Sequence, residues 1–323
     1  MLTIDPHLFT EDAIAPETKA MNDQIEAFLK TAPSIIDLGA PKIRELRREG
    51  QGVLANQPEH EMAGWETAKA NGLEVPVRIF KPEGDLKGIY LHIHGGGHSI
   101  GSADAQDQTL AGMAEALSFG VVSVEYRLAP EHNWPAPADD CEAAALWLVE
   151  NASSLFGTDK ITIGGESAGG HLAAVTIVRL KHRHSMSPFV GANLVYGVYD
   201  FSGTPSVKSW GDRNLIISKP IVDFFAEQLL PAAKFPDVDR QDPDMSPLYA
   251  DLSDLCPALF SVGTMDPIMD DTLFMAPRWL AAGNKTELAV YPGGIHAFDM
   301  IPGLPIAEEF HQRVHKFLSE VVA

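Results

Sequence analysis

The stretch ITIGGESAGGH, residues 161–171, places one serine at the junction of two different sequence patterns. Before Ser167 comes a short run rich in β-branched residues, which is typical of a buried strand. After it, residues 168–182 carry apolar side chains at helical spacing. Gly165 and Gly169 complete the pattern Gly-x-Ser-x-Gly around the serine. Because a sharp strand-to-helix turn leaves no room for larger neighbours, we expect Ser167 to be a nucleophile held in such a turn.

A second match to the same pattern, GHSIG at residues 97–101, makes Ser99 a rival. One Gly-x-Ser-x-Gly match carries little weight, because glycine and serine are common residues. A strand-like run at 88–94 precedes Ser99, but the residues after the motif, SADAQDQ, are typical of a loop or a helix cap. The context therefore favours Ser167 as the nucleophile and Ser99 as a polar loop residue.

Short β-rich runs alternate with helical patterns through most of the chain, and several runs are apolar at consecutive positions. Such runs are typical of strands that are covered on both faces. The alternation predicts an α/β fold with a mostly parallel sheet and helices on both sides. An antiparallel edge is expected from the early runs, between about residues 60 and 80. The expected strands are 75–80, 88–94, 121–126, 160–164, 190–196, 258–263 and 287–291, and the expected helices are 17–30, 41–48, 107–118, 138–150, 168–182, 219–230, 272–282 and 305–321.

Two regions depart from this alternation. Residues 1–50 are polar-rich and helical in pattern. Residues 201–250 lie between two expected strands, contain the helical stretch 219–230, and are too long for a single crossover connection. We therefore expect the first 50 residues and an insertion at about 201–235 to form a helical cap on a catalytic domain of residues 51–323.

The glycine run HGGGH, residues 94–98, comes where a strand-like run ends. Acyl transfer places negative charge on the former carbonyl oxygen, and fixed backbone amides stabilise that charge. Glycines allow bare backbone to approach a substrate closely. We therefore expect the amides of Gly96 and Gly97, with that of Ala168 after the nucleophile, to form an oxyanion hole. His94 is expected to brace this loop through hydrogen bonds.

A serine hydroxyl needs a base to take its proton, and the chain has 12 histidines. His296 lies in the glycine-rich stretch YPGGIHAFD, after the last strand-like run and before the final helical pattern. A loop at that point can place a base over the carboxyl ends of the strands, so His296 is the expected base. His171 lies one helical turn past the nucleophile and is expected to pack. His98 and His132 are expected to shape the pocket.

The carboxylate that orients the base should fall between the serine and the histidine in chain order. Asp266 directly follows a strand-like run, in SVGTMDPIMDD, and the carboxyl ends of strands are where an α/β sheet places its site. We therefore expect Asp266 in this role. Asp270 and Asp271 are alternatives that lie one turn further, where acidic residues often begin a helix. Asp299, close to the histidine in sequence, would need unusual geometry.

Composition excludes several classes of partner. The formal net charge of −20 disfavours nucleic acid and anionic lipid surfaces, which an acidic protein repels. The two cysteines form no CxxC pair and fit a reducing compartment. The N-terminus lacks the basic and then apolar pattern of a secretion signal, and no run of about 18 apolar residues occurs. We expect a cytoplasmic protein that holds no metal.

Five motifs together resemble the hormone-sensitive-lipase-like family of bacterial esterases (family IV), within the α/β-hydrolase fold. The resemblance covers residues 60–321 approximately. It implies a triad of Ser167, Asp266 and His296, a mobile helical cap, and hydrolysis of short- to medium-chain acyl esters without a cofactor. The motifs are HGGGH at 94–98, YRLAPEHNWPAPADD at 126–140, GGESAGGH at 164–171, SPLYADLSDLCPALFSVGTMDPIMDD at 246–271 and YPGGIHAF at 291–298.

The chain departs from the family pattern at two positions near the expected site. His98 stands where relatives often have an aromatic residue, and Glu166 stands where they often have aspartate or threonine. A carboxylate beside the nucleophile could brace a neighbouring loop or shift the pH profile of the reaction. Within the second motif, Arg127 and Glu131 are expected to form a buried pair that supports the site.

The same triad would also serve an amidase, a lactonase or a carbamate hydrolase, and the sequence leaves these alternatives open. A ligand-binding receptor on a hydrolase scaffold is disfavoured, because such proteins typically lack a member of the triad and all three members are present here. The last strand-like run, residues 287–291, and the final helix could pair with a second copy to give a homodimer. The expected partner of the site is a small-molecule ester.

Overall fold

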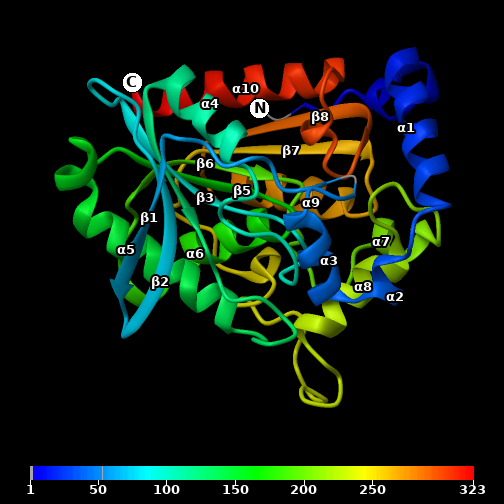
Figure 1. Cartoon of the computed structure of the whole chain (residues 1–323), viewed down its shortest axis with the longest axis horizontal. Helices are drawn as coiled ribbons and strands as arrows, with labels where there is room; N and C mark the ends of the chain where they lie inside the picture. Colours follow the sequence, from blue (N-terminus) through cyan, green and yellow to red (C-terminus); the bar gives the residue numbers. More distant parts are fainter. Residues whose placement is uncertain (1–2, 53) are drawn as a thin grey trace.

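An eight-stranded sheet runs through the part of the chain that the structure describes, residues 3–52 and 54–323 of a computed structural model (Figure 1). Its strands are β1 (Ala63–Ala70), β2 (Leu73–Phe80), β3 (Gly88–Ile93), β4 (Phe119–Val124), β5 (Ile161–Glu166), β6 (Phe189–Val195), β7 (Ala258–Met265) and β8 (Thr286–Ile295). They follow the order β1-β2-β4-β3-β5-β6-β7-β8. β2 pairs antiparallel with both β1 and β4, and all other neighbours are parallel. The mostly parallel sheet with an antiparallel edge is therefore confirmed.

The helices of the described residues include short pieces that the sequence patterns do not predict, α2 and α7. Among these residues, no helix is both long enough and apolar enough to cross a lipid bilayer. The α-helices are α1 (Pro16–Leu29), α2 (Ile35–Leu38), α3 (Ala40–Arg48), α4 (Asp107–Leu117), α5 (Ala136–Phe156), α6 (Ala168–His184), α7 (Pro205–Trp210), α8 (Lys219–Leu229), α9 (Met269–Ala281) and α10 (Pro305–Val322), and the 3-10 turns are η1 (Pro6–Phe9), η2 (Glu11–Ala13), η3 (Pro247–Tyr249) and η4 (Phe298–Met300).

Helices cover both faces of the sheet. Successive residues of a strand point to opposite faces, so the apolar side chains of β3 divide between two cores. Ile89, Leu91 and Ile93 pack in the core that contains α5, α6 and α9, whereas Tyr90 packs in the core that contains α4 and α10. In Figure 1, α4 and α10 lie above the sheet and α5, α6 and α9 below it. Both faces of the central strands are thereby removed from water.

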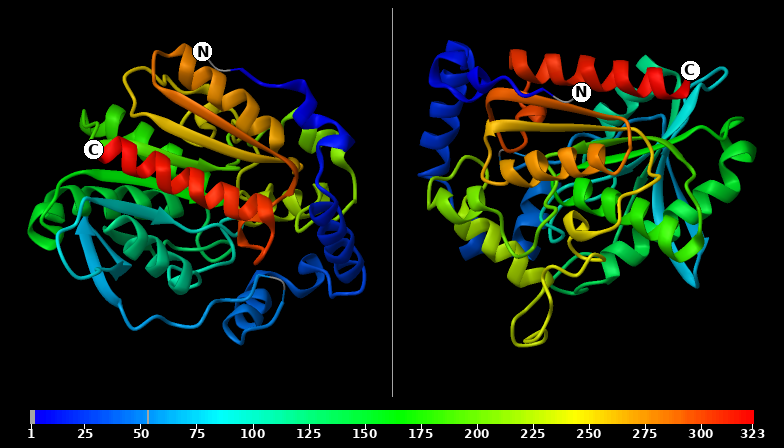
Figure 2. Two further views of the ribbon diagram at one scale, coloured as in Figure 1. Left: turned by 90° about the horizontal axis from the view of Figure 1, so that it is seen from above. Right: turned by 180° about the vertical axis from the view of Figure 1, so that it is seen from behind.

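Four short helices, α2, α3, α7 and α8, lie on the side of the carboxyl ends of the parallel strands (Figure 1), and Figure 2 shows the same end of the molecule from two further directions. α2 contacts α3, and α7 contacts α8. α2 contacts α8, so the N-terminal region and the 201–235 region lie side by side. These are the two regions in which the sequence places helices outside the strand–helix alternation. They cover the end of the sheet at which residue 167 lies.

Polar contacts fasten the N-terminal region to the end of β8 and to the loop that follows β3. In α1, the Asn22 side chain donates a hydrogen bond of 2.8 Å to the carbonyl of Gly293. In α3, the Arg44 guanidinium donates a hydrogen bond of 3.1 Å to the carbonyl of Ser99 and pairs with the carboxylate of Glu131. One anchor therefore lies at the end of β8, just before residue 296, and the other on the loop that follows β3.

The expected pair between Arg127 and Glu131 is wrong. Arg127 instead makes a two-pronged contact with Asp140 in α5, with nitrogen–oxygen distances of 2.8 and 3.0 Å. Glu131 is about half exposed and is used by Arg44. Glu131 is near Arg127 in sequence, but this did not make it the partner. The loop turns back onto the start of α5 and brings Asp140 closer to Arg127.

A buried ion pair joins the antiparallel edge to α4. The Arg78 guanidinium of β2 lies 2.6 Å from the carboxylate of Asp107, and the two side chains are 4% and 0% exposed. The carboxylate also accepts a hydrogen bond from the backbone amide of His60. A buried pair of this kind costs about 3–5 kcal/mol of stability when one partner is removed, because the other charge stays buried without compensation.

We therefore expect Arg78→Met to lower the free energy of unfolding by about 3–5 kcal/mol. The measurement is urea unfolding followed by circular dichroism. Lys69→Met is the matched control, since Lys69 makes an exposed pair with Glu74 on the same hairpin and should cost less than about 1 kcal/mol. Equal losses in the two variants would contradict the assignment of a buried, uncompensated charge at this edge.

Candidate active site

Ser167 occupies a strained turn between β5 and α6. Its backbone angles are φ 57° and ψ −118°, outside the regions that most residues adopt, and its amide donates a hydrogen bond of 2.9 Å to the carbonyl of Val195. A Cβ atom on Gly165 or Gly169 would lie 2.1 or 1.8 Å from the carbonyl oxygen of Ile93 in β3. Only glycine fits at both positions, so the turn exists because two backbones touch beneath the serine.

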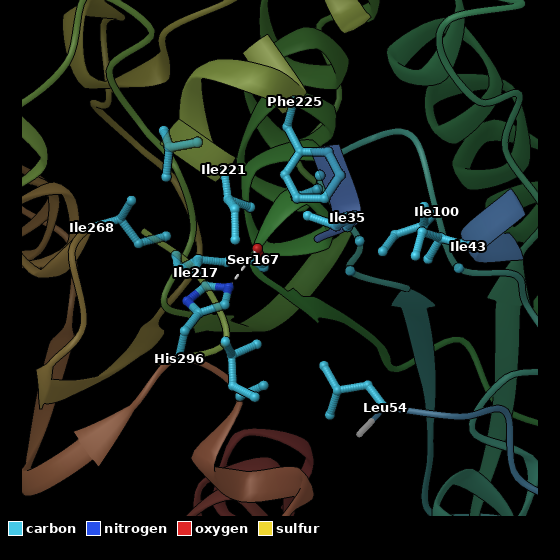
Figure 3. A pocket seen from close by; sticks show the side chains of 18 of the residues that line it. Ile35, Ile43, Leu54, Ile100, Ser167, Ile217, Ile221, Phe225, Ile268 and His296 are labelled. Atoms are coloured by element: carbon cyan, nitrogen blue, oxygen red, sulfur yellow. Dashed lines mark hydrogen bonds between the residues drawn. The ribbon is translucent and has the colours of Figure 1, made fainter. Parts of the chain in front are cut away.

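Ser167, His296 and Asp266 form one hydrogen-bonded chain. His296 Nε2 lies 2.9 Å from Ser167 Oγ, as Figure 3 shows, and His296 Nδ1 lies 2.8 Å from Asp266 Oδ2. Asp266 is 1% exposed, and its second oxygen accepts the amide of Ile268 at 3.0 Å. With Nδ1–H donating to the carboxylate, Nε2 carries the lone pair that can receive the serine proton. The structure thus brings together three side chains that are up to 129 positions apart.

The alternative carboxylates lie in other networks. Asp270 accepts the amide of Ser206, and Asp271 accepts three hydrogen bonds from residues 199–204. Burial raises the pKa of Asp271 to about 7. Asp299 accepts the hydroxyl of a buried tyrosine. In the described part of the chain, the hydrogen bonds of the His296 ring go to Asp266 and Ser167, and none goes to these three carboxylates.

The glycine loop after β3 exposes backbone next to Ser167. Gly96 and Gly97 have φ angles of 114° and 57°, which favour glycine. A Cβ on Gly97 would lie 2.2 Å from the ring of Phe225 in α8, so that helix rests directly on the loop. Among the described residues, no group accepts a hydrogen bond from the amides of Gly96 or Gly97. Ala168 begins α6, where a helix has no internal acceptor for its amide.

His94 is tied into the base of this loop. Its Nδ1 lies 2.8 Å from the carbonyl of Gly95, and its own carbonyl accepts the hydroxyl of Tyr126 at 2.8 Å. The His94 and Tyr126 rings stack with centroids 4.1 Å apart. Burial lowers the pKa of His94 to about 3, so the ring is neutral at physiological pH. These hydrogen bonds and the ring stacking are of the kind by which a side chain can brace the glycine loop.

Glu166, next to the nucleophile, points into a polar cluster beside the sheet. Its carboxylate lies 3.2 Å from His92 Nε2 and accepts a hydrogen bond of 3.4 Å from Gln106. The other nitrogen of His92 lies 2.9 Å from the hydroxyl of Ser123 in β4. Glu166 therefore links β3, β4 and the start of α4 behind the serine.

The remaining histidines of interest divide into packed and exposed ones. His98 Nε2 lies 2.9 Å from His171 Nδ1, and His171 Nε2 donates 2.7 Å to the carbonyl of Met245. Burial lowers the pKa of His171 to about 4 and holds the pKa of His98 well below its ordinary value, so both rings are neutral. His171 packs, as expected, and His98 lines the cavity. The expectation for His132 is wrong, because this residue is exposed and lies outside the cavity lining.

Ser167 and His296 line a mainly apolar cavity of about 990 Å³ (Figure 3). Its walls come from the N-terminal region, the 201–235 region and the glycine loop. Among the described residues, no three His, Cys, Asp or Glu side chains are grouped as a metal site would require. Apolar residues of the lining include Ile35, Leu38, Ile43, Leu54, Ile100, Ile217, Ile221, Phe225 and Ile268.

Known proteins share both the sequence and the fold. Residues 90–300 match the family described as the alpha/beta hydrolase fold. A carboxylic ester hydrolase of Mycobacterium tuberculosis is 36% identical over 70% of this chain, a match that spans 61% of that relative's length. An ethyl acetate hydrolase of Pseudomonas putida is 30% identical over 88% of this chain and 92% of its own.

Solved structures agree with these relatives. An esterase of the archaeon Pyrobaculum calidifontis is 28% identical, with a TM-score of 0.83 over 96% of this chain and 99% of its own. A hormone-sensitive lipase from a metagenome library is 25% identical, with a TM-score of 0.81 over 95% of this chain and 98% of its own. The chain therefore belongs to the α/β hydrolase fold family and, within it, to the carboxylic ester hydrolases related to hormone-sensitive lipase.

Proposed function

We propose that this ester hydrolase works through a covalent acyl-enzyme on Ser167, with His296 as the base and Asp266 as its orienting carboxylate. The observation that carries the proposal is the unbroken chain of hydrogen bonds from Ser167 Oγ through His296 to Asp266, at 2.9 and 2.8 Å. Both distances are within the range in which a proton is shared between nucleophile and base.

In the first half of the reaction, Ser167 Oγ attacks the carbonyl carbon of the ester while His296 Nε2 takes the serine proton. The buried Asp266 carboxylate holds the ring in the tautomer with Nδ1–H and stabilises the imidazolium that forms. His296 then gives the proton to the departing alcohol oxygen. In the second half, a water molecule gives a proton to His296 as its oxygen attacks the acyl carbon. The bond between the acyl carbon and Ser167 Oγ then breaks, His296 returns the proton to the serine oxygen, and the acid leaves.

The negative charge that develops on the carbonyl oxygen is received by the amides of Gly96, Gly97 and Ala168. Support for this role comes from the positive φ angles of the two glycines and from the position of Ala168 at the start of α6. Each donor of such a hole contributes about 3–4 kcal/mol to the stabilisation of a transition state. His94 braces the loop, and Glu166 holds the turn from behind through His92.

The division into a catalytic domain and a cap is also part of the proposal. Residues 1–50 and about 201–235 act as a helical cap on residues 51–323, supported by the presence of both segments in the cavity wall and by the contact of α2 with α8. The substrates are esters with short to medium acyl chains, which this mainly apolar cavity can bind by burial of methylene groups.

Two further expectations concern the setting of the enzyme. A cytoplasmic location is supported by Cys141 and Cys256, which are both free and buried. A homodimer along β8 stays a prediction. η1 and η2 contact this strand, so a second copy would have to share the edge of the sheet with them.

We expect Ser167→Ala to lower kcat on p-nitrophenyl acetate by at least about 10⁴-fold, since the remaining groups cannot form the acyl-enzyme. The matched control is Ser99→Ala in the rival motif. Its hydroxyl is buried and finds no partner among the described residues, so its loss should change the rate less than about threefold. A dead Ser99→Ala enzyme beside an active Ser167→Ala enzyme, both folded by circular dichroism, would contradict the assignment.

The acyl preference is measured with p-nitrophenyl esters from acetyl to dodecanoyl on the wild type. We expect kcat/KM to be highest between acetyl and octanoyl and to fall at dodecanoyl, because a long chain must displace the helices that cover Ser167. Substrate concentrations stay below micelle formation, so that interfacial effects do not enter. A maximum at dodecanoyl would refute the short- to medium-chain assignment and leave the triad untouched.

A further inference from the structure

One guanidinium in the cavity wall has no hydrogen-bond or ion-pair partner among the residues that the structure describes. Arg47, in α3, lines the cavity, and its Nε is fully buried without a hydrogen-bond acceptor. Among the described residues, no carboxylate lies within ion-pair distance of it, in contrast to Arg44, which pairs with Glu131, and Arg78, which pairs with Asp107. Arg47 as a whole is half-buried, but a guanidinium N–H that is shielded from water and has no acceptor is costly, and such groups are normally paired.

Arg47 remains charged despite its surroundings. Burial lowers the pKa of its guanidinium to about 10, which still leaves the group protonated at physiological pH. The other cations of the wall differ in setting. Lys30, Lys42 and Lys208 are exposed, Lys219 pairs with an aspartate, and Arg240 donates to a backbone carbonyl at 3.5 Å. Among the cations of the described lining, Arg47 is therefore the one whose charge is least compensated by water or by a protein acceptor.

Its place in the cavity indicates which part of a substrate could supply that anion. Ile43 and Arg47 are four residues apart in α3 and so share one face of the helix. Figure 3 shows Ile43 and Ile100 on the opposite side of Ser167 from His296. The departing alcohol must lie beside His296, which gives it a proton. The arm of the cavity along α3 is then left for the acyl chain.

We propose that Arg47 binds a carboxylate at the far end of the acyl chain, so that half-esters of dicarboxylic acids are substrates of this site. The inference rests on the proposed function, because it assigns the acyl arm from the role of His296. A guanidinium offers parallel N–H donors that match the two oxygens of a carboxylate. The apolar walls from Ile43 and Ile100 would enclose the methylene groups between the ester and the acid.

Matched esters test this directly. Ethyl hydrogen adipate and ethyl hexanoate have the same chain length and leaving group, and differ in the terminal carboxylate. Hydrolysis of both is followed by pH-stat titration, which needs no chromophore. A carboxylate entering an apolar cavity without a partner is strongly disfavoured. We expect the wild type to hydrolyse the half-ester with a kcat/KM within about tenfold of that for ethyl hexanoate, or higher; rejection of the half-ester by more than about 100-fold would overturn the proposal.

Variants assign the selectivity to one side chain. The readout is the ratio of kcat/KM for ethyl hydrogen adipate to that for ethyl hexanoate. Arg47→Met should lower this ratio at least tenfold, and Arg47→Lys should retain an intermediate value, since lysine keeps the charge and loses the fork. Arg48→Met is the matched control. It removes the same charge from the next residue, which is exposed and outside the cavity lining, and the ratio should stay within about twofold of wild type.

Each further outcome has a defined meaning. An unchanged ratio in Arg47→Met, or an equal fall in Arg48→Met, would overturn the proposal, because the preference would then come from elsewhere or from long-range charge. If Arg47→Met does not fold, the kcat/KM ratios of the wild type and of Arg47→Lys still test the proposal. Failure to hydrolyse either ester would count against the proposed function itself, whereas hydrolysis of ethyl hexanoate alone would count against the role of Arg47.

Discussion

The close approach of two backbones beneath the nucleophile is the constraint on which the site depends. Gly165 and Gly169 bring β5 and the start of α6 against the carbonyl of Ile93, at a separation that no Cβ atom permits. β3 ends at Ile93 and continues directly into the glycine loop that begins at His94. A single contact therefore fixes the position of Ser167 relative to the amides of that loop. A larger residue at either glycine would push the two backbones apart and so move the Ser167 hydroxyl away from the glycine loop.

The position of Ser167 next to the glycine loop is stabilised by hydrophobic packing, by polar contacts between strands and by the attached N-terminal region. Below the turn, the two hydrophobic cores hold the sheet, and the cluster of Glu166, His92 and Ser123 joins neighbouring strands with polar contacts. Above it, the N-terminal region is fastened through Asn22 to the end of β8, just before the histidine, and through Arg44 to the loop that carries the glycines. The cavity between is mainly apolar, and the Arg47 guanidinium in its wall has no ion-pair partner among the described residues.

Local patterns predicted the sheet and the serine turn well, because both depend on short-range features. Consecutive apolar residues mark strands such as β3, and glycines beside Ser167 mark the turn. Features that depend on distant packing were not predictable in this way. α2 has only four residues and carries no helical period. The partner of Arg127 lies 13 residues away, where a returning loop brings it. β1 is mostly exposed, so it lacks the apolar run of a buried strand.

The most direct test of the account is the site at which a fluorophosphonate reacts, because this reagent forms a covalent bond with an activated serine. Peptide mass spectrometry of the labelled protein should find one adduct, on the peptide that contains Ser167, and His296→Ala should abolish it. An adduct on Ser99, or folded protein that stays unlabelled at Ser167, would contradict the claim that the strand-to-helix turn carries the nucleophile.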